Sequence, residues 1–178
     1  MELTFAPRNV LQVNDAAIRF KNFTGRGDKY NREGDRNFSM VISGGVLDDG
    51  NSRRNVTAEE MADALMNDVN QYGVGWNVKI KAPREEGDDP FIYLTIKLKF
   101  NERGPKIYLK SGKHTVPLSE ETVGTLDNMN IVSIDLDIRP YDGDIQGPFR
   151  AAYVQSLWVT QEVNRFAARF AEEEYPEE

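Results

Sequence analysis

The chain has 178 residues and a net charge of −7, and it contains no cysteine and a single histidine, His114. This length is sufficient for one domain with its own hydrophobic core. The composition excludes disulfides, thiolate metal sites and histidine-rich zinc centres. No stretch has the pattern of a secretory signal or the length of a membrane span, so we expect a cytoplasmic protein without membrane partners.

The charge is distributed unevenly along the chain. Residues 1–113 contain 18 Lys and Arg against 16 Asp and Glu, whereas residues 114–178 contain 4 against 13. Such asymmetry is typical of a chain that contacts nucleic acid with its basic part and ends in an acidic tail. Many proteins are acidic for solubility alone, so the charge by itself leaves both interpretations open.

Residues 16–43 contain two strand-like segments on either side of a charged, glycine-bearing loop. The first segment alternates Ile18 and Phe20 with cations, which predicts that Ile18 and Phe20 face the core and that Phe23 lies with the cations on the solvent face. Cations interleaved with aromatic rings on a hairpin suit a single strand of nucleic acid, because the cations meet phosphates and the rings stack on bases. An ordinary hairpin with a solvated loop is the alternative.

The clearest helix of the chain begins at Thr57. Thr57 and Glu60 have the spacing of a capping box, and Met61 and Leu65 belong to an apolar stripe. Gly73 is a typical helix stop, so the helix is predicted to continue to Tyr72.

Two strands with basic outer faces follow the helix. Residues 75–82 alternate apolar residues with Asn77, Lys79 and Lys81, and residues 91–100 form the strongest strand pattern of the chain. We then expect a short strand over residues 106–110, a short helix over 119–127, strands over 131–141 and 149–160, a helix over 161–171, and an acidic, flexible tail over 172–178.

This order of elements predicts a mainly β, β-rich α+β fold. It fits an OB-type Greek-key barrel with inserted helices over residues 1–171, followed by the acidic C-terminal tail, and a β-sandwich is the alternative.

Four carboxylates, Asp135, Asp137, Asp142 and Asp144, raise the alternative of a metal-dependent nuclease. No helix-borne Glu or His partner accompanies them, and acidic residues are also common on solvated strand faces. We therefore expect no catalytic residues, no metal and no cofactor.

Five segments, at residues 20–42, 75–81, 118–127, 134–147 and 150–162, together resemble bacteriophage single-stranded DNA-binding proteins in their order and spacing. The resemblance covers about residues 16–171. It implies a non-enzymatic OB-type protein of phage DNA replication and recombination that binds single strands cooperatively and largely without regard to sequence. The family often ends in an acidic tail, and residues 172–178 fit this feature.

The leading hypothesis is therefore a non-catalytic protein that binds and protects single-stranded DNA. Further expected interactions are copies of the same chain on the DNA, and replication or recombination proteins through the acidic tail. A structural β-domain of a virion or tail is the second hypothesis, and the nuclease is the third. The predicted nucleic-acid-binding residues are Arg19, Lys21, Phe23, Arg26, Lys29, Tyr30, Arg32, Arg36, Trp76, Lys79, Lys81, Tyr93, Lys97, Lys99 and Tyr141.

Overall fold

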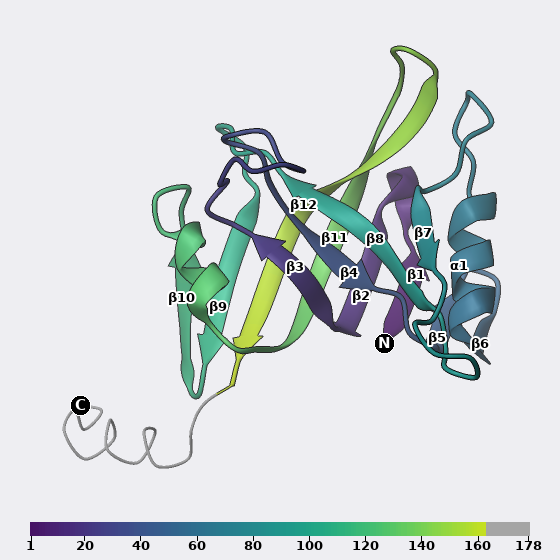
Figure 1. The fold of residues 1–178 in the computed structure, drawn as a ribbon, viewed down its shortest axis with the longest axis horizontal. Coiled ribbons are helices and arrows are strands. Elements are labelled where there is room, and N and C mark those ends of the chain that lie inside the picture. The colour runs from purple at the N-terminus through teal and green to yellow at the C-terminus, as the bar shows by residue number, and fades with distance from the viewer. Residues whose placement is uncertain (163–178) are drawn as a thin grey trace.

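The computed structural model describes residues 1–162, and within them twelve strands form one mixed sheet that is not closed (Figure 1). The predicted mainly β class is confirmed. The strands are β1 (Glu2–Phe5), β2 (Leu11–Ala16), β3 (Ile18–Asn22), β4 (Arg36–Val41), β5 (Gly45–Asp48), β6 (Arg53–Val56), β7 (Val78–Lys81), β8 (Phe91–Leu98), β9 (Lys106–Ser111), β10 (His114–Leu118), β11 (Ile131–Asp144) and β12 (Pro148–Gln161). The helices are α1 (Ala58–Asn67) and two short 3₁₀ turns, Pro7–Asn9 and Val123–Asn128.

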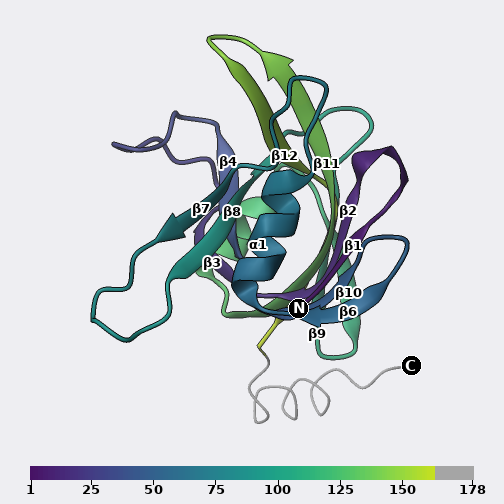
Figure 2. The ribbon, with the colours of Figure 1, turned by 90° about the vertical axis from the view of Figure 1, so that its right-hand side faces the viewer.

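Strand β12 holds the sheet together. Neighbouring strands follow the order β3-β4-β8-β12-β11-β2-β1-β5-β6, with β7 added to β8, and β9 and β10 added beside β12. Strand β12 pairs antiparallel with β11 along nearly its whole length and parallel with both β8 and β9. The hairpin of β11 and β12 projects beyond the rest of the sheet (Figure 1 and Figure 2).

Strands β2 and β3 follow one another with only Ala17 between them. Strand β2 pairs with β11, whereas β3 pairs with β4. The chain therefore changes pairing partner, from β11 to β4, within one nearly continuous segment.

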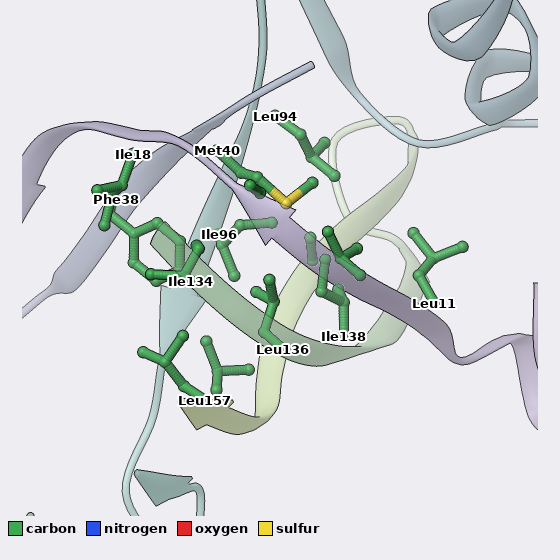
Figure 3. Packing of buried hydrophobic residues seen from close by; sticks show 14 of the residues in the cluster. Leu11, Ile18, Phe38, Met40, Leu94, Ile96, Ile134, Leu136, Ile138 and Leu157 are labelled. Atoms are coloured by element: carbon green, nitrogen blue, oxygen red, sulfur yellow. The ribbon is translucent and has the colours of Figure 1, made fainter. Parts of the chain in front are cut away.

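The hydrophobic core lies on the inner face of this curved sheet (Figure 3). The alternating strands supply it, with Phe38 and Met40 from β4, Leu94 and Ile96 from β8, and Ile134, Leu136 and Ile138 from β11. A period of two places every second residue of a strand on one face, so these residues are buried while their neighbours are not. Each fully buried side chain of this size stabilises the fold by about 1.5–3 kcal/mol.

Helix α1 begins as predicted and ends earlier. Thr57 and Glu60 form both hydrogen bonds of the capping box, and Met61 and Leu65 are buried. The helix ends at Asn67, since Asp68 leaves the helical conformation with ψ of 79°. The Leu65 oxygen then accepts from both the Asp68 N–H at 3.3 Å and the Trp76 N–H of the returning chain at 3.2 Å. The predicted extension to Tyr72 is therefore wrong.

No helix of residues 1–162 is long and apolar enough to cross a membrane. Gln161 is the last residue of β12, so the predicted helix over residues 161–171 is wrong at its first residue. The remainder of that prediction, from residue 163, lies outside the described residues, as does the predicted tail over residues 172–178.

Candidate nucleic-acid interface

A β-bulge in β3 reverses the faces of two phenylalanines. The pairing of β3 with β4 shifts register between Arg19 and Asn22, and Phe20 adopts a left-handed backbone with φ of 54°. A one-residue slip sends every following side chain to the other face. Phe20 is consequently 65% exposed, while Phe23 is fully buried and stacks on Phe38 with ring centroids 5.4 Å apart. The predicted solvent exposure of Phe23 is wrong.

The exposed Phe20 ring joins an aromatic cluster on the outer face of β8, which we call the β8 platform: Phe20, Lys81, Phe91 and Tyr93. Phe91 and Tyr93 stack with centroids 5.0 Å apart, and Phe20 meets Phe91 edge-on at 6.2 Å. The Lys81 ammonium lies 5.5 Å from the Phe20 centroid and 5.6 Å from that of Tyr93. The cluster thus presents rings and a cation together at the surface.

Strand pairing explains how this cluster forms. Strand β7 places Lys81 opposite Phe91 and Lys79 opposite Tyr93, and directly paired residues share one face of a sheet. Lys97 continues the same face of β8 and is exposed, as is Lys99. The platform is therefore bordered by cations at both ends, an arrangement that suits stacked bases with phosphates on either side.

A second cluster of rings occupies the β11–β12 hairpin; we call it the hairpin cluster, and its residues are Arg139, Tyr141, Phe149 and Tyr153. The guanidinium of Arg139 lies 5.3 Å from the Tyr153 centroid, and Tyr141 is 6.1 Å from Tyr153 and 5.8 Å from Phe149. Tyr141 is 51% exposed, in line with the prediction that it lies at the surface. Because Tyr153 pairs with Lys97 of β8, the two clusters lie on neighbouring strands.

The base of this hairpin is fixed by a buried arginine. The side chain of Arg150 donates to both Asp142 oxygens, at 2.8 and 3.2 Å, and to the Asp68 carbonyl at 2.8 Å. The amide of Asn70 donates to Asp142 and to the Phe149 carbonyl. These contacts connect the end of α1 to the hairpin and so fix the position from which the hairpin cluster projects.

The Asp142 carboxylate remains the charged partner in this network. Burial alone would raise the pKa of Asp142, but hydrogen bonds from Arg150 and Asn70 and the charge of Arg150 outweigh it, so the pKa lies below its ordinary value. An ionised carboxylate thus balances the buried guanidinium.

The β3–β4 loop carries exposed cations on a cross-linked backbone. Asn22 accepts from the Gly25 and Arg26 N–H groups, and Asn31 donates to the carbonyls of Arg26, Arg32 and Asp35. Gly25 has φ of 78° and passes so close to Gly34 that a Cβ atom would lie 3.2 Å from the Gly34 backbone. These contacts hold the loop in shape without using its exposed cations.

The loop side chains themselves reach into solvent. Tyr30 is 88% exposed, with the Lys29 ammonium 5.5 Å from its ring centroid, and Arg26 and Arg32 are exposed as well. All four were predicted to bind nucleic acid, and the structure leaves them accessible for it.

Three other predicted residues have structural partners instead. The Trp76 ring is buried, its indole N–H donates to Asp68 at 2.9 Å, and its predicted role as a stacking surface is wrong. Lys21 donates to the carbonyls of Leu126 and Met129, at 3.1 and 2.5 Å. Arg36 donates to the Phe23 carbonyl and pairs with Glu120 at 3.4 Å. We therefore leave these residues out of the site.

The residues from the prediction that lie at the surface are Arg19, Arg26, Lys29, Tyr30, Arg32, Lys79, Lys81, Lys97, Lys99 and Tyr141, with Tyr93 half-buried in the β8 platform. The two ring clusters also contain residues that the prediction did not include, namely Phe20, Phe91, Arg139, Phe149 and Tyr153. Strand alternation alone places Phe91 beside Tyr93, so that signal was present in the sequence. The exposure of Phe20 depends on the bulge, which alternation does not reveal.

The four aspartates of the nuclease alternative do not form a metal site: two of them have structural partners, and no group of metal ligands is found among the described residues. Asp135 accepts the Asp15 N–H at 2.8 Å, and Asp142 belongs to the arginine network. Burial raises the pKa of Asp137. In the part of the chain that the structure describes, no three or more His, Cys, Asp or Glu residues are grouped as metal ligands.

A sequence model of the family described as "Putative phage ssDNA-binding domain" matches residues 2–177. The chain belongs to this family. No curated protein matches it. The match extends over the β8 platform, the hairpin cluster and the β3–β4 loop, so all three belong to the phage ssDNA-binding domain.

Solved structures with a similar fold come from bacteriophage Enc34. Its single-stranded DNA-binding protein, as a C-terminal truncation, is 11% identical, with 90% of each chain covered and a TM-score of 0.53. The same protein without that truncation is 8% identical, with 91% of this chain and 86% of that chain covered and a TM-score of 0.52. Its complex with ssDNA is 9% identical, with 91% and 92% covered and a TM-score of 0.50. At these identities the likeness shows the fold of the domain.

Proposed function

We propose that this phage ssDNA-binding domain binds single-stranded DNA without sequence preference and without catalysis. The β8 platform is the observation that carries the proposal. Every base has a π-face, so rings accept any sequence, and each stacked base contributes about 1–3 kcal/mol. Lys79, Lys81 and Lys97 border these rings and would neutralise the phosphates between bases.

An OB-type architecture accounts for the position of this site. We propose that β2 and β3 act as one bent strand that joins the path β4-β8-β12-β11 into a partly open barrel, which is how OB folds are built. The support is that Ala17 alone separates β2, paired with β11, from β3, paired with β4. OB folds bind strands on a sheet face between two loops, and here the β3–β4 loop and the β11–β12 hairpin would flank the β8 platform.

The biological role that fits such a protein is to cover and protect single strands during phage replication or recombination. The Enc34 single-stranded DNA-binding protein was solved with ssDNA, which supports this reading for a chain of the same fold. We propose that residues 1–171 form the binding domain, that several copies assemble on one strand, and that the acidic residues 172–178 contact replication or recombination proteins.

The acidic segment would also compete with DNA. Residues 172–178 contain five Glu and no cation, and a tethered acidic chain has a high effective concentration at a basic site. Truncation after Ala171 should therefore tighten binding at low salt, with a gain that fades as salt screens the charges. Equal binding by the truncated and full-length chains at low salt would exclude this competition.

A fluorescence anisotropy titration with labelled oligo-dT tests the proposed function. We expect binding to oligo-dT and to mixed sequences with similar affinity, and a steep loss of affinity between about 50 and 200 mM salt. A structural domain of a virion or tail would not bind, and a nuclease would shorten the strand when magnesium is added. Either result would overturn the proposal.

A further inference from the structure

The outward side of β9 repeats the chemistry of the β8 platform at a separate place. Lys106, Tyr108 and Lys110 alternate with Ile107 and Leu109, both buried. The period of two places the lysines and the tyrosine on one outward face, with the two lysine Cα atoms about 13 Å apart. A ring between two exposed cations suits a base with a phosphate on either side.

A tryptophan of the neighbouring strand completes this surface. Tyr108 pairs with Trp158 of β12, and the two half-buried rings stack with centroids 6.1 Å apart and planes 17° apart. The same pairing places Lys106 beside Ser156 and Lys110 beside Thr160. Leu157 and Val159 of β12 are buried in the core on the other side of these strands, so the ring pair lies on the outward surface.

The charges around this surface favour one strand over the other as the path of a nucleic-acid backbone. On the far side of β12, Asp135 lies opposite Trp158 and Asp137 lies opposite Ser156. Carboxylates repel phosphates, whereas the lysines of β9 attract them. A nucleic-acid backbone would therefore follow β9 and avoid β11.

A hollow of about 380 Å³ is lined by Arg139 of the hairpin cluster and by the residues that directly precede β9. Lys99, Arg103 and Arg139 contribute cations to its lining, and Gly104 and Pro105 of the lining lead directly into Lys106. Arg139 also lies over Tyr153 of the hairpin cluster. Cations thus continue from the end of β8 to the start of β9.

We propose that Lys106, Tyr108, Lys110 and Trp158, here called the β9 tract, form a second contact segment for the same single strand. The strand would leave the β8 platform, pass the hollow and continue along β9, with a base stacked on the Tyr108–Trp158 pair. This proposal rests on the proposed function and lengthens its binding site.

Tryptophan emission tests the proposal because the chain has only two tryptophans. Trp76 is buried beneath Arg150, so Trp158 is the one that a base can reach. An oligo-dT of about 16 nucleotides should quench the emission, and one of about 4 should bind with much less quenching; these lengths span the site sizes of OB folds. Trp158→Phe should abolish the quenching without abolishing binding.

The outcomes separate the β9 tract from the β8 platform. Unchanged emission while the long strand saturates the protein would overturn the tract and leave the proposed function intact. Equal quenching by both oligonucleotides would contradict the proposed order of contacts, in which the strand occupies the β8 platform first and reaches the β9 tract only when it is long. Absence of any binding would overturn the proposed function itself.

A charge reversal provides an independent measurement. Lys106→Glu with Lys110→Glu should weaken binding of the long strand at least tenfold at low salt, and lower the salt slope by about 1.4 for two lost phosphate contacts. Binding of the short strand should be unchanged. Arg53→Glu with Arg54→Glu on β6 is the matched control, since both arginines are exposed and paired with carboxylates. Equal losses in the two double variants would contradict the β9 tract.

Discussion

The guanidinium of Arg150 lies 5.1 Å from the centroid of the Trp76 ring, and both side chains are buried. Arg150 belongs to the hairpin, and Trp76 belongs to the segment that returns from α1. The cation and the ring therefore join two parts of the chain that are 74 residues apart, and the Asp142 and Asp68 carboxylates complete the contact.

Loss of this arginine should destabilise the fold severely. Arg150→Met leaves the half-buried Asp142 carboxylate without its cation, and the cost should approach that of breaking a fully buried pair, about 3–5 kcal/mol. Urea unfolding followed by circular dichroism measures the change. Arg53→Met is the control, because its pair with Glu2 is exposed and contributes about 1 kcal/mol or less. Similar losses in the two variants would contradict the network described here.

The two phenylalanines of the bulge should separate binding from stability. Phe20→Ala should weaken binding of oligo-dT by the equivalent of one stacked base, about 1–3 kcal/mol, because its ring is exposed on the β8 platform. Phe23→Ala should instead cost about 3–5 kcal/mol of stability, because its ring is fully buried. Thermal melts and oligo-dT titrations of both variants check this. A loss of stability in Phe20→Ala together with a loss of binding in Phe23→Ala would show that the bulge is wrongly placed.

The same bulge shows where sequence reasoning reached its limit. Alternation correctly predicted strand β8 with its buried Leu94 and Ile96, and the spacing of Thr57 and Glu60 correctly predicted the capping box, since both are local patterns. Alternation failed after Arg19 of β3, where one extra residue moves the following side chains to the opposite face of the strand. The predicted stacking role of Trp76 went against the alternation of residues 75–82, which puts this ring on the apolar side, and in the folded chain the ring is buried in contact with Asp68 and Arg150.

Cations were predictable as a set but not one by one. Lys97 and Lys99 lie outward as the pattern of β8 indicated. Lys21 and Arg36 also belong to a strand pattern rich in cations. Their side chains nevertheless donate to backbone carbonyls elsewhere in the chain, Lys21 to that of Leu126 and Arg36 to that of Phe23. Such long-range partners leave no local signal.

The loop cations should bind phosphates without reading sequence. Replacement of Arg26 and Arg32 by Glu should weaken binding of every oligonucleotide alike and flatten the salt dependence. Titrations at two salt concentrations with oligo-dT and a mixed sequence measure both effects. Arg53→Glu with Arg54→Glu on β6 is the control, since it changes the net charge by the same amount at two exposed positions. Unchanged affinity of the double variant would remove the loop from the binding site.

Asp137 should make stability depend on pH in a particular direction. Burial raises the pKa of Asp137 above its ordinary value of 3.8, so the ionised form destabilises the folded state at neutral pH. Asp137→Asn should therefore be more stable at pH 7, by about 0.5 kcal/mol or less. The difference should shrink as the pH falls through the raised pKa and vanish below 3.8, where the carboxyl is protonated in both states. Urea unfolding across this range tests it, with Asp144→Asn on the exposed part of the strand as the control.

The left-handed backbone of Phe20 lowers the stability of the fold, while it exposes the ring that is proposed to bind DNA. A left-handed conformation costs a residue with a side chain about 1–2 kcal/mol, whereas glycine adopts it freely. Phe20→Gly would thus relieve the strain and remove the ring in a single step. A selection for thermal resistance alone would favour that glycine, and a selection for DNA binding would reject it, so the two pressures are opposed at one codon.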